Sequence, residues 1–90
     1  MIGNTEFEIG GNVVTFDELQ WLWCANLLGH IPSHEVRGIL TLQVLDSLQA
    51  KGLLTETGSN EYGWASQDVQ EWYTNNSAEI EAIIDKENPQ

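Results

Sequence analysis

The chain has 90 residues, of which 14 are Asp or Glu and three are Lys or Arg, and its formal net charge at pH 7 is -11. This length corresponds to one domain spanning 1–90, and a hydrophobic content of 41% with four tryptophans favours a folded chain over a disordered one. The charge disfavours DNA as a ligand, because DNA affinity comes mainly from Lys and Arg side chains that neutralise phosphates. We expect no membrane span, because no run of about 20 apolar residues is present. The single Cys24 and the absence of a basic, apolar leader favour a cytoplasmic protein.

The first 14 residues predict a β-hairpin. Polar and apolar residues alternate over 5–9, as in a half-buried strand. Gly10 and Gly11 then favour a tight turn, and 12–14 form a short returning strand.

Residues 15–18 form a capping box, in which Thr15 and Glu18 satisfy each other's backbone amides at the start of a helix. The spacing predicts a helix over 16–28 that ends at Gly29. Four of its residues form one apolar stripe that we expect to be buried, namely Leu19, Leu22, Trp23 and Leu27. Trp21, Cys24 and Leu28 lie outside this stripe, so the helix is apolar nearly all round and is either central or carries a dimer or partner interface.

The segment 33–51 predicts one long helix or two. Ser33 can cap its start, Gly38 is a weak point, and Thr41 can cap a second helix. The Lys51–Gly52 pair is typical of a helix end. The expected buried residues are Val36, Ile39, Leu40, Val44, Leu45 and Leu48.

After this helix, the sequence predicts a second hairpin over 53–65, which we call the wing, and helices over 66–75 and 77–86. Ser66 can cap the first of these helices, and Asn75-Asn76-Ser77 is interpreted as a break between them. Ile80, Ile83 and Ile84 repeat at helical spacing in the second helix, and 87–90 read as a polar tail. Trp72 is assigned to the core together with Trp23, whereas Trp64 could face either way.

Residues 42–54, followed by a polar hairpin and Tyr62, resemble a winged-helix domain, in which a leucine-spaced helix ends in Lys-Gly-Leu-Leu and continues into the wing. The resemblance implies a small α+β domain with an N-terminal hairpin, a wing and C-terminal helices. Winged helices bind DNA, RNA or proteins, so the resemblance implies no single function. The sequence departs from a DNA-binding pattern, since the solvent side of the predicted recognition helix offers Gln43, Asp46 and Ser47, and only Lys51 could meet a phosphate.

No catalytic, metal or cofactor site is expected. Cys24, His30 and His34 are residue types that bind zinc, but no second cysteine is present and Pro32 separates the two histidines. Cys24 lies in an apolar helix, where burial makes a thiol inert. The chain also lacks a glycine-rich phosphate loop and a nucleophile elbow.

The excess of acidic residues therefore carries the functional hypothesis. A strong negative field steers a protein towards basic surfaces, which belong chiefly to nucleic-acid-binding proteins. We expect a non-enzymatic, protein-binding module that acts as an inhibitor or DNA mimic; in size and charge alone the chain is similar to small acidic phage proteins of the anti-restriction and anti-CRISPR type. The alternatives are a dimeric winged-helix regulator and a subunit module of a larger complex. The expected partner contacts are Glu56, Glu61, Trp64, Asp68 and Glu71, with Trp21, Cys24 and Leu28 as an apolar dimer or partner face.

Overall fold

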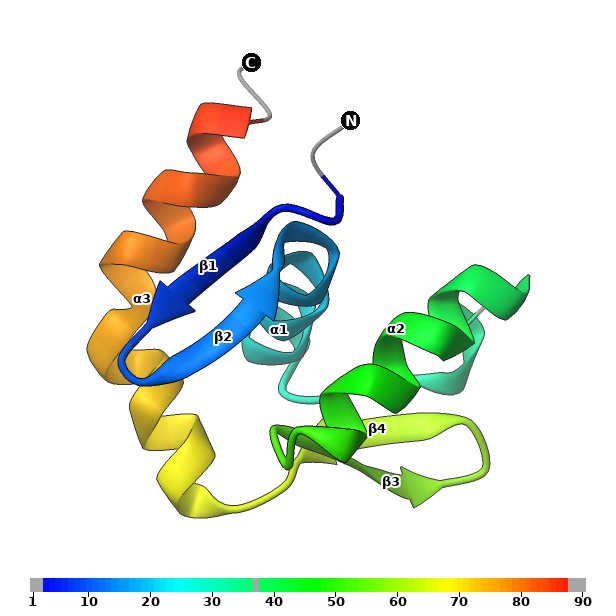
Figure 1. The fold of residues 1–90 in the computed structure, drawn as a ribbon. Coiled ribbons are helices and arrows are strands. Elements are labelled where there is room, and N and C mark those ends of the chain that lie inside the picture. The colour runs from blue at the N-terminus through cyan, green and yellow to red at the C-terminus, as the bar shows by residue number, and fades with distance from the viewer. Residues whose placement is uncertain (1–2, 37, 88–90) are drawn as a thin grey trace.

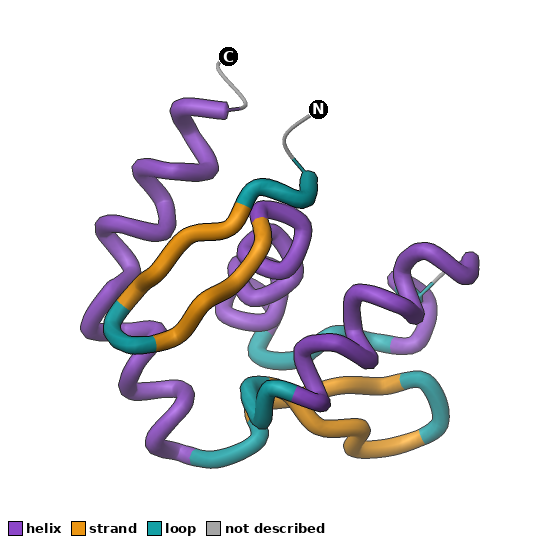
Figure 2. Tube along the Cα trace, viewed as in Figure 1, coloured by secondary structure: helices purple, strands orange, loops and turns teal. Residues whose placement is uncertain are grey.

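The computed structural model describes residues 3–36 and 38–87 and has the predicted α+β organisation, with one hairpin before the helices and another between them (Figure 1). In chain order the elements are β1 (Glu6–Ile9), β2 (Asn12–Thr15), α1 (Phe16–Leu28), the 3₁₀ helix η1 (Ser33–Glu35), α2 (Gly38–Ala50), β3 (Leu54–Gly58), β4 (Glu61–Trp64) and α3 (Gln67–Glu87). The two hairpins form separate two-stranded sheets (Figure 2).

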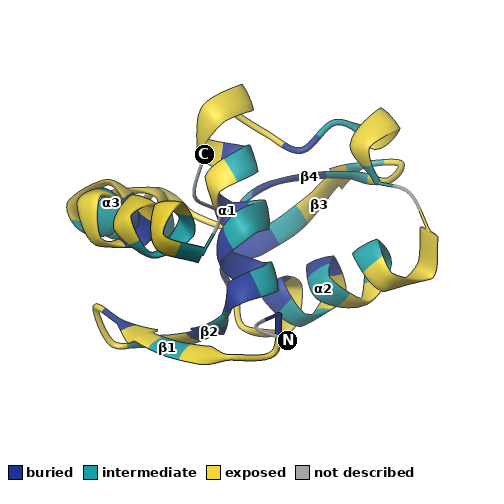
Figure 3. Ribbon diagram, turned by 90° about the horizontal axis from the view of Figure 1, so that it is seen from above, coloured by how far each residue is buried: buried dark blue, intermediate teal, exposed yellow. Residues whose placement is uncertain are grey.

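Helix α1 is the centre of the molecule. It contacts α2, α3, β2 and β4, and Figure 3 shows it lying between α3 on one side and α2 on the other. Its buried residues pack with apolar residues of α2, α3 and both hairpins. This core contains Ile9, Val14, Leu19, Leu22, Ala25, Ile31, Leu45, Leu48, Leu53, Leu54, Tyr62, Tyr73 and Ile80.

The predicted capping box begins α1. The Thr15 amide donates to Glu18 Oε1 at 2.8 Å, and the Glu18 amide donates to Thr15 Oγ1 at 3.2 Å. Val14 and Leu19, on either side of the cap, are both buried, and Gly29 ends the helix with a left-handed φ of 85°. The local signals of the sequence therefore placed both ends of α1 correctly.

The first hairpin is fastened to α3 through its turn. Trp72 Nε1 donates to the carbonyl of Ile9 at 2.9 Å. A Cβ atom at Gly10, which has a φ of 55°, would lie 2.7 Å from that indole nitrogen, so only glycine lets the turn approach the ring this closely. The assignment of Trp72 to the core is thus right for its contacts, although the side chain is only half-buried.

The segment between α1 and η1 is joined to the β3–β4 hairpin by a two-way backbone contact. The Ile31 amide donates to the Tyr62 carbonyl at 2.7 Å, and the Tyr62 amide donates back at 3.0 Å. Ile31 thereby occupies the place of a third strand beside β4. Because Ile31 and Tyr62 are both buried, this bridge fixes the hairpin against the end of α1.

Helix α3 corrects the predicted break at 75–77, because it runs unbroken from Gln67 to Glu87. The polar side chains of that segment bond to their own helix: Asn76 Nδ2 donates to the Trp72 carbonyl at 2.8 Å, and Ser77 Oγ donates to the Thr74 carbonyl at 3.1 Å. Tyr73 and Ile80 are fully buried on either side of the segment, so core packing outweighs its low helix propensity. The start of the helix agrees with the prediction, since the Val69 amide donates to Ser66 Oγ.

The predicted helix over 33–51 is divided. Ser33–Glu35 form η1 without a side-chain cap, and α2 begins at Gly38, so Thr41 lies inside α2 and caps nothing. Gly38 has a φ of 80°, which explains why the weak point predicted there became a boundary.

Several residues predicted to be buried are exposed. Trp23, Leu27, Ile39 and Leu40 have exposed fractions of 38%, 64%, 72% and 74%. On α1 the buried face runs through Phe16, Leu19, Leu22 and Ala25, which turns Trp23 and Leu27 outward. On α2, Ile39 and Leu40 belong to the first turn, which extends beyond the rest of the fold in Figure 1.

Tyr73 gives a test of the core. Its ring lies 5.5 Å from that of Trp64 between centroids, and its buried hydroxyl has no hydrogen-bond partner among the described residues. Burial, and then the charge of Glu81, raise the pKa of Tyr73 to about 12 from its ordinary 10.0. The folded state therefore resists ionisation, so this residue's contribution to stability is complete below pH 10.0 and is lost as the pH rises towards about 12.

We predict that Tyr73→Phe leaves the free energy of unfolding at pH 7 unchanged or raises it by about 1 kcal/mol, because it removes an unsatisfied polar group and keeps the ring. The variant should also lose less stability than the parent above pH 10.0. Urea unfolding at both pH values measures this. A destabilisation of more than about 1 kcal/mol at neutral pH would instead reveal a bound water at the hydroxyl.

Candidate functional site

The acidic side chains lie at the surface with one exception, Glu18, which is 2% exposed. Of the predicted partner contacts, Glu56, Asp68 and Glu71 are exposed, whereas Glu61 and Trp64 are half-buried. Two of the carboxylates have local donors: Glu56 Oε2 accepts from the Asn60 amide, and Glu71 Oε2 from Gln67 Nε2, each at 3.2 Å. These contacts leave the charges accessible to a partner.

The structure spreads these residues along one edge instead of gathering them. Glu61 begins β4 next to the hairpin tip, whereas Asp68 and Glu71 lie in the first turns of α3. Figure 1 shows the hairpin tip and the start of α3 at opposite ends of the β3–β4 hairpin. Sequence proximity within 56–71 therefore indicated an acidic edge of the fold and not a compact cluster.

Buried Glu18 is the centre of a polar network that the sequence did not reveal. Besides the Thr15 amide, its carboxylate accepts from Ser47 Oγ at 2.6 Å and from Lys51 Nζ at 2.6 Å, and Lys51 Nζ also donates to the Val13 carbonyl at 2.9 Å. Ser47 and Lys51 were expected on the solvent side of the helix. They are four residues apart and share one helix face, and that face meets the start of α1.

The network holds Glu18 ionised. Burial by itself raises the pKa of this carboxyl group, but hydrogen bonds from Lys51, Ser47 and the Thr15 amide, with the charge of Lys51, outweigh burial and lower it below 4.5. A lowered folded-state pKa means that the stabilisation is present above the unfolded value and is lost as the pH falls through the folded one. The one lysine of the predicted recognition helix is therefore engaged in holding the fold.

We predict that Lys51→Met lowers the free energy of unfolding by about 2 kcal/mol at pH 7, because it leaves a buried carboxylate without its counter-charge. The loss is smaller than for a fully buried pair because 34% of the Lys51 side chain is exposed. Chemical denaturation at pH 7 measures it. Lys86→Met, at an exposed position near the end of α3, is the matched control and should change stability by no more than about 0.5 kcal/mol; equal losses in the two variants would contradict the role of the network.

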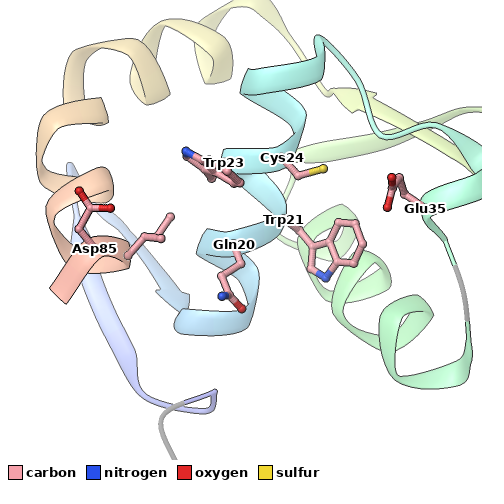
Figure 4. A pocket seen from close by; sticks show the side chains of 7 residues that line it. Gln20, Trp21, Trp23, Cys24, Glu35 and Asp85 are labelled. Atoms are coloured by element: carbon pink, nitrogen blue, oxygen red, sulfur yellow. The ribbon is translucent and has the colours of Figure 1, made fainter. Parts of the chain in front are cut away.

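A cavity of about 520 Å³ opens on the opposite side of α1 (Figure 4). Its lining residues come from α1, η1 and α3, and they are Gln20, Trp21, Trp23, Cys24, Glu35, Ile84 and Asp85. Trp21 and Cys24 belong to the predicted apolar face, whereas Leu28, the third residue of that face, is exposed and does not line the cavity. Glu35 and Asp85 were missed because no local pattern relates η1 or the end of α3 to α1.

Cys24 is poorly suited to nucleophilic chemistry in this cavity. Burial, and then the charge of Glu35, raise the pKa of its thiol, so the reactive thiolate is disfavoured at neutral pH. The nearest candidate base in sequence to Glu35, His34, contacts that carboxylate: its Nε2 atom lies 3.6 Å from Glu35 Oε1, and both side chains are exposed. Among the described residues, no three His, Cys, Asp or Glu side chains come together in a way that could hold a metal ion.

Comparison of the chain with protein-family models, with curated proteins and with solved structures finds no match. Within residues 3–36 and 38–87, no helix has the length and apolar character needed to cross a membrane.

Proposed function

We propose that the chain is a non-enzymatic protein-binding module that occupies the basic nucleic-acid-binding surface of a partner protein. The observation that carries this proposal is the engagement of Lys51. Lys51, which directly follows α2, is the one described cation of the segment 38–52 that the winged-helix resemblance assigns to recognition, and it bonds to Glu18 and to the Val13 carbonyl. Asp46 and Gln43 are exposed on α2, so this helix offers a DNA duplex one carboxylate and no Lys or Arg.

The order of elements supports the comparison with winged helices. Helix α1 is followed by the Ile31 bridge, the short helix η1, the longer helix α2 and the β3–β4 hairpin. In this proposal, a fold typical of DNA-binding proteins has a negatively charged surface, as DNA has. Inhibitors of anti-restriction or anti-CRISPR type, to which the chain is similar in size and charge, represent the kind of function we propose.

The acidic edge formed by Glu56, Glu61, Asp68 and Glu71 is the proposed contact surface, with the half-buried Trp64 beside it. Carboxylates at the surface of a hairpin and a helix steer a basic partner at long range and add little stability to the fold. Association should therefore depend on salt through its rate, because exposed charges are screened beyond about 8 Å at physiological ionic strength.

A competition experiment tests the proposal. A panel of basic DNA-binding proteins, each bound to a fluorescent duplex, is titrated with the chain, and DNA release is followed by anisotropy. We predict release from at least one panel member, and an association rate that falls about tenfold or more when Glu56, Glu61, Asp68 and Glu71 are all changed to Lys. The chain alone should not bind the duplex below about 10 µM.

The matched control is the reversal of Glu6 and Glu8, two exposed carboxylates on β1. Equal effects per charge at both places would mean that only the total charge matters. Failure to displace DNA from any panel member, or tight and salt-sensitive binding of the duplex by the chain itself, would refute the proposed function.

A dimeric regulator is the second candidate, and the exposed apolar side chains favour it. Leu27 and Leu28 at the end of α1, and Ile39 and Leu40 at the start of α2, are all well exposed. Between residues 19 and 45 the sequence has one acidic residue, Glu35, so this part of the surface can meet a second copy with little charge repulsion.

We predict that Leu28→Glu shifts the chain to a monomer if this surface forms a homodimer, because the change places like charges across the two-fold axis. Sedimentation velocity at several concentrations measures the change. Val13→Glu, on β2 and also exposed, is the control and should leave assembly unchanged. A parent chain that already sediments as a monomer would remove the second candidate.

A further inference from the structure

The cavity beside α1 combines two indole rings with two carboxylates from different elements. Trp21 and Trp23 come from α1, Glu35 from η1 and Asp85 from the last turns of α3. No Lys or Arg side chain is present among the described residues that line it. The cavity is thus both apolar and negatively charged.

The lining side chains lie on two sides of helix α1 (Figure 4). Trp23 projects towards α3 and Asp85, whereas Trp21 lies on the other side of α1, towards Glu35, with Cys24 between them. Glu35 and Cys24 line the same cavity, and the charge of Glu35 adds to burial in raising the pKa of the Cys24 thiol. Each side of the cavity therefore offers one indole and one carboxylate.

This pairing selects a class of ligand. An indole face attracts cations, and a guanidinium group can stack on an indole while its N–H groups donate to a carboxylate. An apolar ligand would remove water from Glu35 and Asp85 without replacing their hydrogen bonds, and an anion would be repelled by both. The exposed His34–Glu35 contact of 3.6 Å is weak enough for an incoming guanidinium to replace.

We propose that this cavity binds arginine side chains of a basic partner protein, taking two neighbouring arginines of one segment, one at each indole–carboxylate pair. The inference deepens the proposed function and rests on it for the identity of the natural partner. The acidic edge would guide the partner at long range, and the cavity would hold specific side chains at short range.

A small probe tests the cavity without any macromolecular partner. The dipeptide acetyl-Arg-Arg-amide is titrated into the labelled chain, and the four indole N–H signals are followed by NMR. We expect saturable shifts of the Trp21 and Trp23 signals. The Trp72 N–H, which is bonded to the Ile9 carbonyl, and the Trp64 N–H should not move. The dipeptide with citrulline in place of arginine has the same shape without the charge and should cause no saturable shift.

The matched variants separate a site from a diffuse field. Glu35→Gln with Asp85→Asn should weaken binding of the dipeptide about tenfold or more. Glu6→Gln with Glu8→Gln removes the same charge from β1 and should change it by less than about twofold. All four residues are exposed, so thermal unfolding should show both double variants folded.

The outcomes distinguish this inference from the proposed function. Equal weakening by both double variants, equal binding of the citrulline dipeptide, or the absence of shifts at Trp21 and Trp23 would each overturn the cavity proposal. None of these results affects the DNA-release experiment, which can still support the acidic edge. Conversely, saturable dipeptide binding in a chain that releases no DNA would retain the arginine site and refute the wider function.

Discussion

The buried carboxylate of Glu18 is the constraint on which the rest of the structure depends. It accepts hydrogen bonds from the Thr15 amide at the junction of β2 and α1, and from Ser47 and Lys51 in and after α2. Two segments far apart in sequence, 15–18 and 47–51, are thereby held by one ionised group. Burying an ionised carboxylate that is 2% exposed costs free energy unless its hydrogen-bond partners are in place. The network therefore fixes which residues of α2 lie against α1, in addition to the apolar burial that drives the two helices together.

The same network decides which charges are available for function. In an acidic chain, a lysine at the end of an exposed helix would ordinarily be the natural contact for a phosphate. Here Lys51 is directed inwards to Glu18 and to the Val13 carbonyl, while Asp46 on the same helix stays exposed. The fold therefore uses Lys51 in an internal ion pair and exposes carboxylates at its surface.

Local chemistry predicted much of the architecture. The capping box at Thr15, the helix end at Lys51–Gly52 and the cap at Ser66 depend on neighbouring residues alone, and the structure confirms each of them. The errors arose where the presence or absence of tertiary contacts, and not local sequence, decides the outcome. The segment 75–77 contains helix-disfavouring residues but lies between buried Tyr73 and Ile80, and Ile39 and Leu40 are apolar but belong to a helix turn that no other element covers.

The two proposed contact surfaces differed in how far the sequence could define them. Glu56, Glu61, Asp68 and Glu71 are close in sequence and lie along one edge, although at opposite ends of the hairpin. For the cavity, periodicity on one helix indicated Trp21 and Cys24, but the carboxylates of Glu35 and Asp85 reach it from segments 50 residues apart (85 minus 35). Such a convergence has no signature in a single sequence, because it is created only when α3 and η1 pack around α1.

The placement of the charges also gives folding and binding opposite responses to ionic strength. Glu18 is buried, so its ion pair with Lys51 is less affected by added salt than the exposed carboxylates, which repel one another across the molecule. Added salt relieves that repulsion and favours the compact state, yet it would weaken the proposed attraction to a basic partner. The fold should thus be most stable in concentrated electrolyte, the condition in which the proposed association would be weakest.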